Sequence, residues 1–176
     1  IQPLAFLVST LRAHGEENVQ AMGFSHELSG SELDLFKAIA WAPDCKVVVR
    51  GLPDPLKVIV LPKGEVDKRL KFPAGSRISN LRSDDSLKEF ASGAAQTAAH
   101  DSFSPVTNAK LGAVIVGIDN RVYPGSYLEI PNSYTVMGPL QGAIASYLSG
   151  GNSYDKIKAI MLAVKMPKNC SSAPQE

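Results

Sequence analysis

In the first quarter of the chain, apolar residues recur every three to four positions, which is the period of a helix with one buried face. Residues 3–14 predict such a helix, and Gly15 is suited to end it. Residues 31–42 predict a second helix, with Ser31 as its N-cap and Pro43 just beyond its last turn.

The same period returns twice in the second half of the chain. Residues 86–100 are rich in alanine and predict a helix with Ser86 as its N-cap. Residues 139–148 predict another helix, because Pro139 suits a first turn and the glycine pair that starts at Gly150 suits a helix end.

Runs of β-branched residues mark the strands that we expect in the first half. Two such runs lie at residues 45–51 and 56–62, separated by a proline-rich turn. Residues 62–85 are polar and interrupted by proline and glycine, which indicates a linker or an exposed loop with one short strand at 76–80.

In the second half, residues 111–118 predict a buried strand. The Asp–Asn pair at 119–120 is a turn signal, so residues 121–130 should return antiparallel to that strand. Residues 155–165 predict a further strand. The order helix, strand, strand, helix, strand predicts an α/β fold whose sheet is covered by helices.

Composition adds little to this picture, because 44% of the 176 residues are hydrophobic, 20% are charged and the net charge is +1. Such a charge gives no general attraction to nucleic acid or acidic lipid, and no apolar run is long enough to span a bilayer. Cys45 and Cys170 form no disulfide framework, which favours an intracellular compartment. The chain begins at Ile1 without a secretory signal pattern, as expected of a processed mitochondrial protein or of a trimmed chain.

Four successive stretches carry a family resemblance: FASGAAQTAAHDSFSPVTNAKLGAVIVG, IDNRVYPGSYLEI, PLQGAIASYLSGG and IKAIMLAV. This order of an alanine-rich helix, a glycine-marked hairpin, a helix and a strand resembles the cytidine deaminase superfamily. It is most similar to the zinc-free second domain of the two-domain cytidine deaminases. The resemblance implies a three-layer α/β sandwich, with a central mixed sheet flanked by helices.

The resemblance also suggests how the chain is divided. Residues 1–85 are expected to form an N-terminal extension with helices and a pair of strands, in which 62–85 is the linker. Residues 86–176 are expected to form a deaminase-like domain that lacks the zinc motifs.

The resemblance places Pro139 at the family's first zinc ligand and Gln141 at the glutamate that moves protons. Proline has no lone pair for a metal, and a glutamine amide does not titrate near neutral pH. Cys170 is the one retained residue of the P-C-x-x-C motif, because Asn169 and Ala173 replace its proline and second cysteine. A catalytic zinc needs about three protein ligands, so we expect no metal, no cofactor and no catalytic residue.

Two hairpin positions correspond to the family's ribose-binding asparagine and glutamate. Tyr127 occupies the first of them, whereas Glu129 retains the second. Both are therefore candidates for a residual ligand contact. The favoured alternative for Glu129 is an exposed strand end or a partner of a nearby arginine.

Other candidate chemistry is weaker. No nucleophile motif accompanies the three histidines, so His14 and His100 are better explained as residues at helix ends, and His26 as an exposed loop residue. The basic loop at 62–82 could contact RNA phosphates, but acidic residues interrupt it and Phe72 is its one aromatic ring. A solvated loop or a protein contact is the favoured reading.

These observations favour a catalytically inactive deaminase-like protein that serves as a structural or assembly subunit. Its partners would be protein subunits of a larger complex or further copies of itself, because members of the family are usually oligomers packed through these helices. The alternative is the zinc-free half of a cytidine deaminase whose catalytic half lies in another domain or subunit. RNA binding is the third hypothesis.

Overall fold

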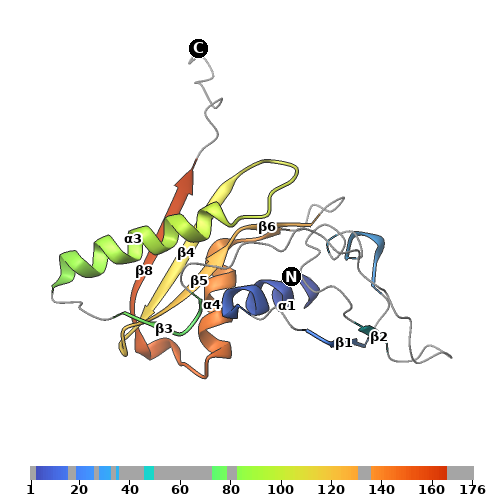
Figure 1. Cartoon of the computed structure of the whole chain (residues 1–176), viewed down its shortest axis with the longest axis horizontal. Coiled ribbons are helices and arrows are strands. Elements are labelled where there is room, and N and C mark those ends of the chain that lie inside the picture. The colour runs from blue at the N-terminus through green and yellow to red at the C-terminus, as the bar shows by residue number, and fades with distance from the viewer. Residues whose placement is uncertain are drawn as a thin grey trace, which may run out of the picture.

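The computed structural model describes residues 3–15, 19–25, 28–32, 35, 46–49, 73–78, 83–130 and 136–165 (Figure 1). Among the described residues, the helices with described bounds are α1 (Pro3–His14), α3 (Asp84–His100) and α4 (Pro139–Ser149), with a short 3-10 turn, η1 (Tyr154–Lys156). Residues 30–32 and 35 are also helical. Its strands are β1 (Ala21–Phe24), β2 (Lys46–Val49), β3 (Ser76–Arg77), β4 (Lys110–Gly117), β5 (Arg121–Ser126), β6 (Leu128–Glu129), β7 (Val136–Met137) and β8 (Ile157–Lys165).

A four-stranded sheet with the order β3-β5-β4-β8 forms the centre of the fold. Each described pairing in it is antiparallel. β4 and β5 form a tight hairpin, and Asn120 in its turn has a φ of 58°, a left-handed conformation that asparagine tolerates better than most residues. The described parallel pairings lie outside this sheet, between β1 and β2 and at the bridge from Phe103 to Leu128.

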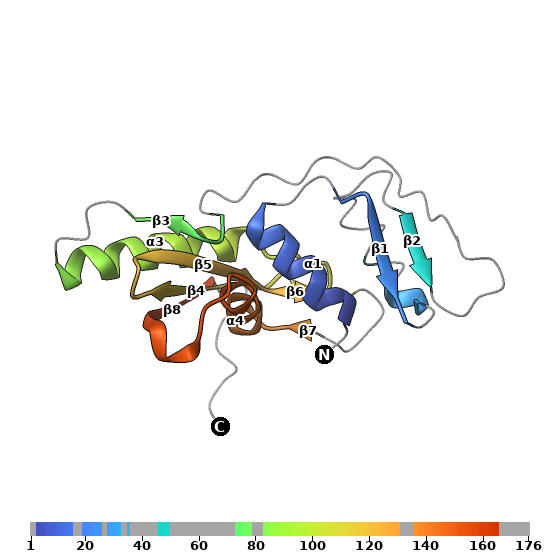
Figure 2. The same ribbon diagram turned by 90° about the horizontal axis from the view of Figure 1, so that it is seen from below.

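Helices α3 and α4 cover opposite faces of this sheet (Figure 2). Alternate residues of β4 point to opposite sides, so Val114 and Val116 pack under α3, whereas Ala113 and Ile115 pack under α4. On the α4 side, the rings of Tyr123 and Tyr147 meet edge to face, with their centroids 5.0 Å apart. The α/β class, with a central sheet between helices, is therefore confirmed.

Two glycines let these helices approach the sheet backbone. A Cβ on Gly112 would lie 2.2 Å from the carbonyl oxygen of Ala95 in α3. A Cβ on Gly125 would lie 2.2 Å from the carbonyl oxygen of Pro139 in α4. No side chain fits at either position unless a helix moves away.

Helix α1 adds a third cluster of apolar side chains beside α4. Leu4 and Val8 of α1 are fully buried together with Leu128 and Met137 from the β6–β7 pair. The Nε2 atom of His14 lies 3.3 Å from the carbonyl oxygen of Ser146 in α4. The N-terminal helix therefore shares its core with the deaminase-like half, and the boundary between residues 85 and 86 remains a prediction.

The elements predicted in the second half of the chain are largely observed, with several corrections. Strands β1 and β7 were not predicted, and the predicted strand at 121–130 is divided into β5 and β6.

The predicted N-cap Ser31 is wrong, because residues 30–32 are already helical and Ser29 exchanges hydrogen bonds with Glu32. The start of α3 also differs from the prediction. Ser83, not Ser86, is its N-cap, and Ser86 is the third helical residue that completes a capping box. The Oγ atom of each serine accepts the backbone N–H of the other, at 3.2 Å and 3.1 Å. Two aspartates then occupy the first turn, where the helix dipole favours negative charge.

Several expected features lie outside the described residues. They are the strand at 56–62, most of the helix at 31–42 and most of the loop at 62–85. Within the described part of the chain, no helix has both the length and the apolar character needed to cross a membrane.

The contact between α3 and β4 at Gly112 can be tested with a pair of alanine substitutions. Gly112→Ala should lower the free energy of unfolding by about 2 kcal/mol or more, because its Cβ would overlap helix backbone. Gly93→Ala is the matched control, since a Cβ there meets nothing within 4 Å, and it should stabilise α3 by up to about 1 kcal/mol. Urea unfolding would measure both changes, and equal effects would contradict this packing.

Candidate functional site

The start of α4 and the β5–β6 segment meet at one place in the fold. β6 pairs with β7, so that Glu129 lies opposite Val136, and β7 leads directly into α4 at Pro139. Gly125 of β5 contacts the first turn of the same helix. The positions that the sequence singled out at 127, 129, 139 and 141 therefore belong to neighbouring elements.

The carboxylate of Glu129 is buried, with 3% of the residue exposed, and points at the loop that leads from α3 into β4. Its Oε2 atom accepts the backbone N–H groups of Val106 and Thr107, at 2.8 Å and 3.2 Å. Its Oε1 atom accepts the Thr107 hydroxyl, and the Tyr127 side chain is a further hydrogen-bond partner. The expectation of an exposed Glu129 is therefore wrong.

These contacts determine the ionisation states of Glu129 and Tyr127. Burial alone would raise the pKa of Glu129, but the hydrogen bonds from Thr107, Val106 and Tyr127 outweigh it and lower that pKa. The pKa of Tyr127 is raised, first by burial and then by the negative charge of Glu129 beside it. At neutral pH the site therefore holds an ionised carboxylate and a neutral phenol.

The loop that supplies these donors is fastened to the hairpin by its backbone. The N–H of Phe103 donates to the carbonyl of Tyr127 at 3.0 Å, and the N–H of Glu129 donates to the carbonyl of Phe103 at 2.8 Å. Ser102 is buried, and its Oγ atom bonds the backbone of Leu111. The backbone and the side chain of Glu129 therefore both hold this loop against β6.

Residues 106 and 107 were not among the sequence candidates, although a signal for them exists. The stretch SPVTN combines proline, threonine and asparagine, which is typical of a turn with free backbone donors. Asn108 confirms the turn, with a φ of 54°. The carboxylate of Glu129, which follows β4 and β5 in the sequence, accepts these donors. The local sequence does not indicate this contact, because the fold brings the two segments together.

Pro139 and Gln141 both support the start of α4. Pro139 is the first helical residue, where its missing N–H has no partner to lose. The Oε1 atom of Gln141 accepts the N–H of Gly138, the N-cap residue, at 2.9 Å. Gly138 has no side chain to cap the helix, so the glutamine supplies one of the hydrogen bonds that a helix start requires.

The described residues at the start of α4 do not fit a zinc ion. Residues 138–142 read GPLQG and offer no histidine, cysteine or carboxylate. Across the described ranges, no group of three or more His, Cys, Asp or Glu side chains is placed to hold a metal. Cys45, Cys170 and His26 lie outside those ranges, so their predicted roles are not placed here.

A small cavity lies nearby, between α1 and the β5–β6 segment. Its lining comes from Ser9, Arg12, Ala13, Pro124, Ser126 and Leu128. The sequence candidates at 127, 129, 139 and 141 are not part of that lining. His14 and His100 both end helices, as expected, and Asp101 lies 3.6 Å from the His100 ring.

Comparison with known proteins assigns the family. The profile described as "Cytidine and deoxycytidylate deaminase zinc-binding region" matches residues 55–174, which is more than half of the chain. The chain belongs to the cytidine deaminase family. The recognition made from the sequence is thus confirmed for the family, whereas the resemblance to a zinc-free domain remains a prediction.

The relatives are plant proteins. Cytidine deaminase 1 of Arabidopsis thaliana is 33% identical over 103 residues, which cover 56% of this chain and 33% of that protein. Cytidine deaminase 2 of the same plant is 36% identical over 84 residues, which cover 47% of this chain and 24% of that protein. The chain thus spans about a third or less of the length of these relatives.

A solved structure is also similar. The crystal structure of the cytidine deaminase from Burkholderia pseudomallei superposes with a TM-score of 0.42 and 24% identity, over 49% of this chain and 67% of that one.

The buried carboxylate predicts an acid-sensitive stability. Because the folded-state pKa of Glu129 is lowered, its contribution is present above the unfolded pKa of about 4.3 and is lost as pH falls through the folded value. Glu129→Gln should cost about 1–3 kcal/mol at neutral pH and should flatten the acid limb of the stability curve. Urea unfolding between about pH 3 and pH 7 measures both effects.

Thr107 offers a matched pair of controls for this prediction. Thr107→Ser keeps the hydroxyl that Glu129 accepts and should behave like the wild type, whereas Thr107→Val should lose part of the stability. An unchanged acid limb in Glu129→Gln would contradict the assignment.

The cap on α4 predicts opposite results for two substitutions of Gln141. Gln141→Ala removes the acceptor for the Gly138 N–H and should cost about 0.5–2 kcal/mol. Gln141→Glu keeps an acceptor and adds a negative charge at the positive end of the helix, so it should be neutral or stabilising. Thermal unfolding distinguishes the two, and equal losses would argue against a capping role.

Proposed function

We propose that this chain is a non-catalytic member of the cytidine deaminase family that acts as a structural or assembly subunit of a larger protein complex. The observation that carries the proposal is the start of α4, where Pro139 opens the helix and Gln141 caps it. Neither side chain can hold a zinc-bound water or exchange a proton with it near neutral pH.

The surroundings of Glu129 support the same proposal. An ionised carboxylate has about four lone-pair sites, and here four donors from Val106, Thr107 and Tyr127 approach it. A sugar hydroxyl would have to displace one of these internal donors. The one acidic group of the hairpin that resembles a ligand-binding residue is therefore used to hold the fold.

A second candidate function is the zinc-free half of a cytidine deaminase. The names of the Arabidopsis relatives and the limited share of them that the chain spans favour this alternative. A catalytic partner subunit would then carry the zinc and the proton-transfer group, and this chain would support it. The two candidates differ in whether a deaminase activity depends on this chain.

Assays on the purified chain test the proposal. The protein should release no ammonia from cytidine or deoxycytidine and should hold no stoichiometric zinc by elemental analysis. An active cytidine deaminase assayed in parallel is the control for both measurements. One zinc per chain together with turnover would overturn the proposal.

Isolation of the native complex separates the two candidates. If a zinc-bearing deaminase co-purifies with this chain and loses activity when the chain is depleted, the second candidate is correct. An assembly without deaminase activity supports the first.

A further inference from the structure

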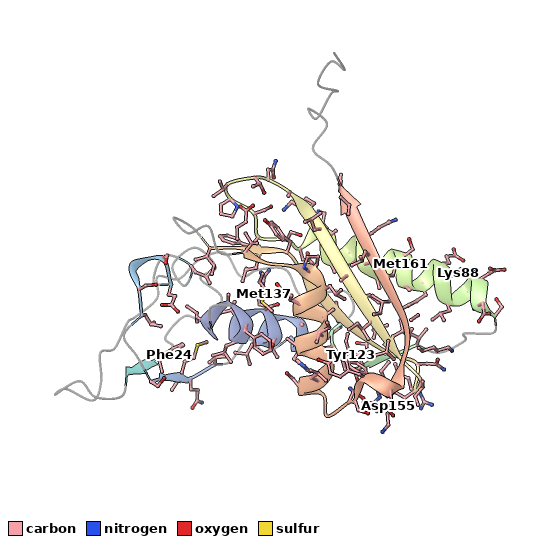
Figure 3. The ribbon with its side chains drawn as sticks, turned by 180° about the vertical axis from the view of Figure 1, so that it is seen from behind. Phe24, Lys88, Tyr123, Met137, Asp155 and Met161 are labelled. Atoms are coloured by element: carbon pink, nitrogen blue, oxygen red, sulfur yellow. The ribbon has the colours of Figure 1, made fainter. Side chains whose placement is uncertain are left out.

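The small cavity between α1 and the β5–β6 segment joins side chains from distant parts of the chain. Its described lining comprises one face of α1, where residues three and four positions apart meet, and one side of the hairpin strand, where alternate residues meet. The lining residues are Ser9, Arg12, Ala13, Pro124, Ser126 and Leu128. In Figure 3, α1 passes Met137 and ends toward Tyr123, and α1 contacts both β5 and α4.

Two hydroxyl groups of this lining have no hydrogen-bond partner among the residues that the structure describes. Ser9 is 8% exposed, and its Oγ atom lies against Gly142 of α4, where a Cβ would come within 2.8 Å of it. Ser126 is half-buried and lies opposite Gly112 of β4. A hydroxyl that is withdrawn from water without a new partner costs free energy. Both hydroxyls can therefore gain from a polar group that enters the cavity.

Arg12 gives the cavity a positive charge. It is the one charged residue in the described lining. Its Nη2 atom donates to the carbonyl oxygen of Asp101 at 3.5 Å, so the guanidinium reaches from α1 to the end of α3. A guanidinium has five N–H donors in a planar fork that matches the two oxygens of a carboxylate. The lining therefore favours an anionic ligand.

The rest of the lining limits what kind of anion fits. Half of the lining residues are apolar, namely Ala13, Pro124 and Leu128, and would face the carbon part of a ligand. A single arginine balances the single charge of a carboxylate, whereas a phosphate monoester carries about −1.5 to −2. The cavity has a volume of about 320 Å³ with its open mouth included, at the lower end of the range for ligand pockets. These features together select a small organic acid.

We propose that this cavity binds the carboxylate of a small organic acid. Arg12 pairs with the carboxylate, and the hydroxyls of Ser9 and Ser126 donate to its oxygens. The side chains of Glu129 and Gln141 are not part of the lining, so the site is distinct from the hairpin and helix-start positions described above. The inference goes beyond the proposed function and does not depend on it, because binding a carboxylate requires neither zinc nor deamination.

Acetate and acetamide are matched probes for this site, because they have nearly the same shape and differ in charge. An NMR titration of the full chain with acetate, at constant ionic strength, should shift the amide signals of the lining residues along a saturating curve. Acetamide should give no saturating shifts, and inorganic phosphate should bind more weakly than acetate. An acetate titration without saturation, or acetamide or phosphate that binds as well as acetate, overturns the proposal.

Substitution of Arg12 tests the source of the charge. Arg12→Gln should weaken acetate binding by about tenfold or more, because it removes the charge-assisted hydrogen bonds. Lys88→Gln is the matched control, since it removes the same charge from a side chain of α3 that is 71% exposed. Figure 3 shows Lys88 far from α1, and this variant should bind acetate like the wild type.

Substitution of Ser126 is a second, milder test, which remains informative if Arg12→Gln does not fold. Ser126→Ala should weaken acetate binding by about threefold or more, because one donor is lost. Ser149→Ala is its control, since the Ser149 hydroxyl is exposed and donates to the carbonyl oxygen of Ala145 in α4. The dispersion of the NMR spectrum reports whether each variant is folded. Wild-type affinity in folded Arg12→Gln or in Ser126→Ala, or an equal loss in either control, overturns the proposal.

Discussion

The direct contact of two helices with the backbone of one β-hairpin is the constraint on which the rest of this structure depends. Gly112 on β4 lets α3 approach from one side, and Gly125 on β5 lets α4 approach from the other. With both helices so close, the sheet between them is filled by small and β-branched side chains such as Val114 and Ala113. The position of the α4 N-terminus beside β6 follows from the contact at Gly125.

Much of this architecture could be predicted from the pattern of the sequence. Helical periods, the Asp–Asn turn and the glycines after α4 gave the element order, because each is a local signal with a local cause. The packing of α1 against α4 is different, since the contact of His14 with Ser146 joins residues that are 132 positions apart. No pattern in the local sequence indicates such a contact.

The site shows the same division between local and non-local causes. The role of Pro139 in the first turn follows from its chemistry alone, whereas the role of Glu129 depends on the donors that the fold brings to it. A glutamate near a strand end is exposed in most proteins, which is why the sequence favoured exposure. It is buried here because the loop at 102–109 supplies two backbone amides and a hydroxyl in return.

The polar side chains around Glu129 and Gln141 and the apolar side chains of β8 differ in their surroundings. The side chains of Glu129 and Gln141, which could have bound a ligand, form hydrogen bonds within the chain instead. The polar groups that these bonds join therefore already have partners. Along β8, by contrast, the side chains of Ile160, Leu162 and Val164 are largely exposed in the described part of the structure. Exposed apolar surface favours contact with further polypeptide, whereas a polar group that is already hydrogen-bonded gains little from an external partner. The two regions therefore differ in what they present to solvent: the carboxylate of Glu129 is enclosed by its own hydrogen bonds, whereas the described outer face of β8 is apolar and exposed.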